Sequence, residues 1–197
     1  MLAREKLSDQ DLIKRYIDGD HQSIEVLINR HKNKVYTYIL MTVRNPVLAE
    51  DLFQDTFIKV VHSLKQGKYV ENGRFLSWVI RIAHNLSIDY FRKENQLYTL
   101  SNDDYENDIF NHSRFSDKTI EEMLVEDQIL NEVKQLIEYL PPEQKEVVML
   151  RHYGGLSFKE IAEQTQVSIN TALGRMRYAL INMRKMIKEK NLNLTVQ

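Results

Sequence analysis

Apolar residues recur at steps of three and four along most of this chain, which is the spacing of a buried face on an α-helix. The pattern predicts helices at about 8–17, 21–43, 46–65 and 74–93 in the first half, and at about 119–139, 143–153, 158–164 and 169–187 in the second. Breaks fall where Gly or Pro interrupts the pattern, at Gly19, Pro46, Gly67–Gly73 and Pro141–Pro142. We therefore expect an all-α fold of two small helical domains.

Apolar periodicity is weakest between residues 95 and 118, where Asn, Asp, Ser and His accumulate. Such composition is typical of a solvated tether rather than a packed element. The predicted organisation is a four-helix domain over residues 1–94, a flexible acidic linker over 95–118 and a second helical domain over 119–197.

The last predicted helix is amphipathic. One apolar stripe consists of Leu173, Met176, Leu180, Met183 and Ile187, and the basic residues that mostly project elsewhere are Arg175, Arg177, Arg184, Lys185 and Lys188. A helix of this kind can bury one side and lay the other on phosphates.

The residues before this helix predict a helix-turn-helix. Ser157 stands three residues before Glu160, which is a capping-box pattern at a helix start, and 165–167 make the turn. Ser168 then caps the last helix, whose first turns are the part that reaches base edges in helix-turn-helix docking. A helical hairpin that only packs is the alternative.

Composition excludes several classes of protein. The chain has no Cys, which excludes disulfides and thiolate metal sites, and its 6 His show no paired metal spacing. We find neither a Gly-rich phosphate loop nor a catalytic constellation, so we expect no enzyme activity, metal or cofactor. No apolar run approaches a membrane span and the start lacks a signal-peptide core, so no membrane insertion and a cytoplasmic location are expected.

Charge is distributed unevenly along the chain. The net charge is −1 overall, but it is +3 over residues 1–94, −3 over 95–119, −6 over 120–146 and +5 over 147–197. Basic ends around an acidic middle suggest two separate nucleic-acid contacts.

The first half offers two polar surfaces. Asp51, Gln54 and Asp55 lie together at helical spacing and form either ordinary solvated surface or a site for a basic partner. In the fourth helix, Arg81, Asn85 and Arg92 share a side that can contact phosphates and base edges.

Further candidates lie near that row. His84 lies beside it, and Tyr69, Phe75 and Trp78 can stack on an unpaired base. A purely structural core role is the alternative for Phe75 and Trp78.

Three segments in order resemble the sigma factors of bacterial RNA polymerase, specifically their compact extracytoplasmic-function (ECF) group. Ala49–Phe57 is similar to region 2.2, Phe75–Arg92 to regions 2.3 and 2.4, and Leu140–Leu150 with Gly155–Ala162 to region 4. The resemblance spans nearly the whole chain outside the linker. It implies a transcription initiation factor that guides core polymerase to promoter −10 and −35 elements and helps open the DNA.

The resemblance also implies roles for residues. Asp51, Gln54 and Asp55 match the surface that grips the clamp coiled coil of the polymerase's largest subunit. The residues implied at the −10 element are Lys68, Tyr69, Arg81, His84, Asn85 and Arg92, with the Lys68–Gly73 loop and Asn85 at the pocket for a flipped base. Those implied at the −35 element are Ser168, Asn170, Thr171, Arg175 and Arg177.

The implied partners are the polymerase clamp and flap, promoter DNA and an anti-sigma factor. The acidic linker is expected either to occupy the polymerase's nucleic-acid channels or to serve as a plain tether. The sequence departs from the family at 168–174, which carries no Lys or Arg and contains Gly174. Gly174 weakens the helix but permits a close backbone approach to DNA or to a neighbouring helix.

The rival interpretation is a helix-turn-helix regulator that binds an operator without polymerase, with residues 1–94 as a sensing or dimerising domain. It predicts tight binding to duplex DNA by the protein alone, whereas the sigma interpretation predicts promoter opening only with core enzyme.

Overall fold

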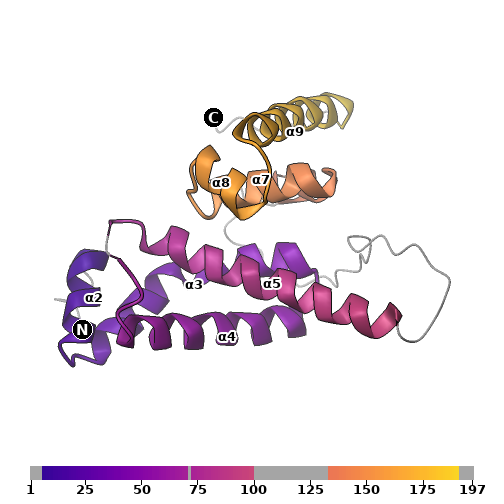
Figure 1. Ribbon diagram of the computed structural model, residues 1–197. Coiled ribbons are helices and arrows are strands. Elements are labelled where there is room, and N and C mark those ends of the chain that lie inside the picture. Colours follow the sequence, from indigo (N-terminus) through magenta and orange to yellow (C-terminus); the bar gives the residue numbers. More distant parts are fainter. Residues whose placement is uncertain (1–5, 71, 100–132, 191–197) are drawn as a thin grey trace, which may run out of the picture. The chain divides into compact units, whose positions relative to one another are not determined.

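The computed structural model describes residues 6–70, 72–99 and 133–190, and every regular element in these ranges is an α-helix (Figure 1). The predicted all-α fold is confirmed. The chain divides into two compact units, one built from helices α2 to α5 and the other from α7 to α9. Most of the predicted linker and most of the predicted helix 119–139 lie outside the described residues.

Within the described residues, the first unit is a bundle of four helices: α2 (Asp9–Ile17), α3 (Gln22–Val43), α4 (Pro46–Lys65) and α5 (Phe75–Thr99). α2 packs on α3 and α4, and α3, α4 and α5 contact one another pairwise. Their apolar faces meet in a core whose fully buried members include Leu12, Leu27, Val35, Ile39, Val60, Leu64, Phe75 and Val79. This core holds the outward faces of α4 and α5 in fixed orientations.

Local sequence signals explain where these helices begin and end. Ser8 caps α2, since its Oγ accepts the Asp11 N–H at 3.1 Å. Gly19 follows α2 with a φ of +105°, a conformation that glycine adopts without strain. Asn45 caps α4, because its Oδ1 accepts the Val47 N–H at 3.0 Å and Pro46 occupies the first helical turn.

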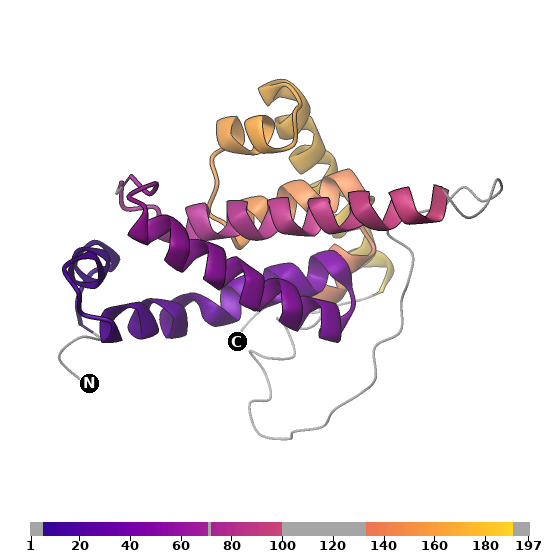
Figure 2. The same ribbon diagram turned by 60° about the horizontal axis from the view of Figure 1, so that its bottom comes forward.

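The predicted end of α5 at residue 93 is wrong. The helix continues to Thr99, and its last turns project beyond the ends of α3 and α4 (Figure 1, Figure 2). The sequence contains neither Gly nor Pro between Gly73 and Pro141, so nothing there forces the helix to stop where the apolar periodicity fades. Residues 95–99, which were expected to begin the linker, are therefore helical.

The second unit contains α7 (Pro142–His152), α8 (Phe158–Gln164) and α9 (Ile169–Glu189), preceded by helical residues 133–138. The predicted capping box is present, since Ser157 Oγ accepts the Glu160 N–H at 3.3 Å while Glu160 Oε2 accepts the Ser157 N–H at 2.8 Å. α9 packs on both α7 and α8. The helix-turn-helix is therefore formed, with its second helix lying across the other two.

The predicted buried stripe of α9 is wrong by about a quarter turn. Ala172 and Ala179 are the buried residues, whereas Leu173 and Leu180 are exposed and Met176, Met183 and Ile187 are half-buried. The packed row lies one residue earlier in the sequence, which is about 100° around the helix. Alanine lets helices approach closely, so α9 packs through its small residues and leaves larger ones on the surface.

Gly174 does not serve a close approach among the residues that the structure describes, because no neighbouring heavy atom of theirs lies within 4 Å of where a Cβ would stand. We expect Gly174→Ala to stabilise this unit by about 0.5–1 kcal/mol, since alanine loses less backbone entropy in a helix. Differential scanning calorimetry of the full chain measures the change. The matched control is Gly19→Ala, which should destabilise the protein because φ there is +105°. A lower melting temperature for Gly174→Ala would contradict the prediction.

Candidate nucleic-acid interface

The exposed face of α4 carries the predicted acidic patch. Asp51, Gln54 and Asp55 are all exposed, and Gln54 Nε2 lies 3.4 Å from Glu50 Oε1 on the preceding turn. Leu52, Thr56 and Val60 bury the opposite side of the helix, which keeps the patch turned to solvent. We call Asp51, Gln54 and Asp55 the α4 acidic patch.

Two exposed apolar side chains on the same face were not predicted. Val47 is 75% exposed and Ile58 is 67% exposed. They lie four residues before and seven residues after Asp51, so all three share one side of α4. Aliphatic groups beside a charged patch add apolar area that a protein partner can cover, and the sequence did not distinguish them from core residues.

The predicted row on α5 is only partly exposed. Asn85 and Arg92 are exposed, with Arg92 Nη1 lying 3.8 Å from Asp89 Oδ1, whereas Arg81 is half-buried. Asn85 presents both a hydrogen-bond donor and an acceptor, and Arg92 presents a cation. These are the groups that contact base edges and phosphates.

The loop before α5 is anchored by an aromatic cluster. Tyr69 is half-buried, and its ring centroid lies 4.6 Å from that of Trp78 and 5.9 Å from that of Phe75. Phe75 is buried and Trp78 is half-buried, so the core role considered for Phe75 agrees with its placement. Lys68 and Val70 on either side of Tyr69 are exposed. We call Tyr69, Phe75 and Trp78 the loop-base aromatic cluster.

His84 does not lie on the exposed row. Its side chain is in the core, 4% exposed, and its Nδ1 lies 2.8 Å from the hydroxyl of Tyr38 on α3. Burial lowers the pKa of His84 to about 4, so the imidazole is neutral near pH 7. Periodicity placed His84 beside Asn85, but the face of α5 that packs on α3 extends far enough around the helix to include it.

The helix-turn-helix residues divide into structural and exposed groups. Ser168 Oγ accepts the Thr171 N–H at 3.0 Å, so these two residues form the cap of α9. Asn170 and Arg177 are exposed on the first turns. Arg175 is half-buried, and its charge acts on Glu146 of α7.

The Arg175 interaction appears in the titration of its neighbour. Burial raises the pKa of Glu146, and the Arg175 guanidinium opposes that rise. Arg175 therefore interacts with a carboxyl group of its own unit, whereas Asn170 and Arg177 are exposed.

The outward face of α9 is unusually apolar. Its exposed large side chains are Ile169, Leu173, Tyr178, Leu180 and Ile181. The predicted basic residue Arg177 lies among them, and Arg184 and Lys185 follow. A surface that alternates aliphatic groups with cations suits both nucleic-acid and protein contacts.

Within the described ranges, no His, Asp and Glu side chains gather in a group that could hold a metal ion. No helix among the same residues combines the length and apolarity that a bilayer crossing requires.

Comparison with known proteins gives a consistent result along the chain. The family model described as Sigma-70 region 2 matches residues 27–96, and the one described as Sigma-70, region 4 matches residues 130–177. The ECF RNA polymerase sigma-E factor of Haemophilus influenzae is 30% identical over 191 residues, which cover 94% of this chain and 96% of that protein. The ECF RNA polymerase sigma factor SigW of Bacillus subtilis is 26% identical over 182 residues, covering 90% and 95%.

Two solved structures share the fold. RpoE in complex with the anti-sigma factor NepR, from Bartonella quintana, has a TM-score of 0.61 at 17% identity and covers 85% of this chain and 98% of its own. CnrH in complex with the cytosolic domain of CnrY has a TM-score of 0.57 at 19% identity and covers 92% and 97%.

Proposed function

The chain belongs to the ECF group of RNA polymerase sigma factors, which direct the polymerase to promoters at the start of transcription, and from this premise we propose which surfaces perform each step. The observation that carries the proposal is the separation of three surfaces with different chemistry, on α4, on α5 with its preceding loop, and on α9. On each of these helices one side packs in the core of its unit, and the opposite side carries the exposed residues of the proposed surface.

The α4 acidic patch is the proposed contact with the clamp coiled coil of the polymerase's largest subunit. Asp51 and Asp55 supply charge for a basic partner, and Gln54 supplies an amide on the same exposed side of the helix. We include Val47 and Ile58 in this surface, because an interface gains affinity from aliphatic side chains that lose water on contact.

The loop and α5 are the proposed reader of the −10 element. Asn85 would contact an unpaired base, and Lys68 and Arg92 would contact phosphates. Tyr69, next to Val70, would line the pocket that receives the flipped base. The half-buried Arg81 fits a phosphate contact at the edge of this surface. His84 is left out of the proposed DNA contacts, because its ring lies in the core and hydrogen-bonds Tyr38.

The first turns of α9 are the proposed reader of the −35 element. Ser168 and Thr171 fix the start of the helix, Asn170 would reach base edges, and Arg177 would neutralise a phosphate. Arg175 is proposed as a weaker contact, since Glu146 already faces its charge.

Further partners follow from the exposed apolar part of α9 and from the relatives. We propose that Leu180 and Ile181 meet the polymerase flap, and that an anti-sigma factor covers the DNA- and polymerase-binding surfaces when the protein is inactive. Each of the two solved structures that share the fold is a complex with a partner protein, named as an anti-sigma factor in one case, which supports this proposal. The acidic segment after α5 is proposed as a tether between the two units of the chain.

Run-off transcription with purified core polymerase on genomic fragments tests the proposed function. The protein should initiate RNA synthesis at discrete promoters only when core enzyme is present. A stand-alone regulator would instead bind its site tightly without polymerase and would give no new transcripts.

In the same assay, Asn85→Ala is expected to lower transcription about 10–100-fold, because a lost base-edge hydrogen-bond pair costs about 1–3 kcal/mol. Affinity for core polymerase, measured by fluorescence anisotropy, should stay unchanged, because Asn85 lies on α5 and the α4 acidic patch is intact. Unchanged transcription from a matched promoter would refute the role of Asn85.

A further inference from the structure

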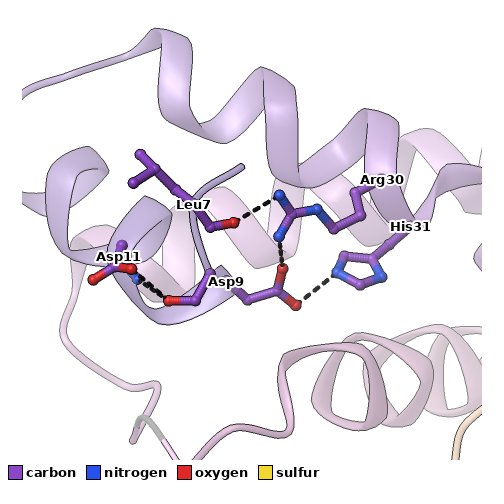
Figure 3. A network of polar contacts seen from close by, with 6 residues as sticks. Leu7, Asp9, Asp11, Arg30 and His31 are labelled. Atoms are coloured by element: carbon purple, nitrogen blue, oxygen red, sulfur yellow. Dashed lines mark hydrogen bonds and ion pairs between the residues drawn. The ribbon is translucent and has the colours of Figure 1, made fainter. Parts of the chain in front are cut away.

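A carboxylate on α2 joins two neighbouring residues of α3. Asp9 Oδ1 accepts from Arg30 Nη1 at 2.5 Å, and Asp9 Oδ2 accepts from His31 Nε2 at 2.8 Å (Figure 3). Arg30 also donates from Nη2 to the backbone oxygen of Leu7 at 2.8 Å. Both carboxylate oxygens are therefore used. The hydrogen bond from His31, ahead of the Arg30 contact, holds the pKa of Asp9 below its ordinary value.

The same histidine contacts the loop-base aromatic cluster. The side chain of His31 is 12% exposed, and its ring centroid lies 5.6 Å from that of Phe75 at the start of α5. Phe75 in turn lies 5.9 Å from both Tyr69 and Trp78. His31 thus stands between the Asp9 carboxylate and the rings on which the loop rests, and it is the member of the Asp9 network whose ring contacts that cluster.

We propose that Asp9 and His31 are positioning residues for the −10 recognition loop, by which we mean the loop before α5 that contains Lys68, Tyr69 and Val70. The inference rests on the proposed function of that loop. Asp9 fixes the orientation of the His31 ring, the ring supports Phe75, and Phe75 with Trp78 holds Tyr69 in place. A loop already held in its binding conformation loses less conformational entropy when it captures an unpaired base. Helix α2 would thereby contribute to promoter selection without touching DNA.

Comparison of an Arg30 variant with a His31 variant distinguishes a positioning role from simple anchoring of α2 to α3. Arg30 binds the same carboxylate and also the backbone oxygen of Leu7, whereas the ring contact with Phe75 is made by His31. If the network only fixed α2 to α3, Arg30→Gln and His31→Leu would have equal effects. If His31 positions the loop, only the His31 and Asp9 variants disturb the cluster.

The single Trp of the chain gives a direct measurement, because Trp78 belongs to the cluster. Acrylamide quenching of Trp78 fluorescence in the full chain should increase about twofold in His31→Leu and Asp9→Asn, because looser packing admits the quencher. His31→Gln, which retains a donor toward Asp9 but lacks the ring, should increase quenching as well. Arg30→Gln should match the wild type, and circular dichroism should show unchanged helix content in all four variants.

Transcription with core polymerase supplies the second measurement. His31→Leu and Asp9→Asn should each reduce, by about fivefold, the discrimination between promoters that differ by one −10 base. The reason is that a loosened loop loses more conformational entropy when it binds. The affinity for core polymerase should be unchanged. Unaltered Trp78 quenching in His31→Leu, or equal changes in Arg30→Gln, would overturn the inference. Increased quenching with unaltered base discrimination would instead refute the assignment of the loop to the −10 element, and the positioning role with it.

Discussion

Core polymerase is expected to bind the double variant Asp51→Lys, Asp55→Lys about 100-fold more weakly than the wild type. Each reversed charge turns an attraction for a basic partner into a repulsion, and two such changes at an interface cost on the order of 3 kcal/mol together. Both side chains are exposed, so the loss arises at the interface and not in the core. Fluorescence anisotropy with labelled protein and purified core enzyme measures the affinity.

The double variant suits this measurement because the charge repulsion within α4 is about the same in the variant as in the wild type. Asp51 and Asp55 are a like-charge pair four residues apart on α4, and two lysines would repel by a similar few tenths of a kcal/mol. Glu25→Lys is the matched control, because Glu25 is an exposed acid on α3 outside the α4 acidic patch. If polymerase association survives the double reversal, the proposed role of the patch is wrong, whatever the promoter assays show.

The second large effect is an acid instability centred on His84. Burial lowers the pKa of His84 to about 4 from its ordinary 6.5, so the unfolded chain binds a proton between these values that the folded chain does not. The contribution to stability is complete above pH 6.5 and is lost as the pH falls toward 4. Integrated from pH 7 to pH 5, it amounts to about 2 kcal/mol.

Urea unfolding of the full chain at pH 7 and at pH 5, followed by Trp78 fluorescence, measures this loss. His84→Gln removes the titrating group but keeps a polar side chain opposite Tyr38, so its stability should fall by about 2 kcal/mol less than that of the wild type over the same pH interval. The control is His62→Gln, since the imidazole of His62 is exposed on α4. A wild-type pH dependence in His84→Gln would mean that another group causes the instability.

His84 also shows how far residue type can mislead a functional assignment. Histidine beside arginine and asparagine suggests a nucleic-acid surface, and the spacing along α5 placed it next to Asn85. The position of the neighbouring helix decides the matter, because α3 places Tyr38 against this side of α5. An imidazole that is hydrogen-bonded and removed from water serves packing instead of phosphate binding.

The proposed partner-binding surfaces were predicted unevenly for a related reason. The charged members of the α4 acidic patch stand out in the sequence, whereas Val47 and Ile58 look like core residues until the packed side of the helix is known. The Asp9–His31 contact joins residues more than twenty positions apart on two helices, and helical periodicity relates only near neighbours.

The sequence by itself determined where most helices begin and end, because caps, prolines and glycines act on the backbone within a few residues. Ser157 and Ser168 cap their helices as expected, and Ser8 and Asn45 cap two further helices. Only the tertiary structure decided which sector of each helix faces inward. That choice depends on how closely neighbouring helices approach, and at α9 the small Ala172 and Ala179 turned the larger Leu173 and Leu180 outward.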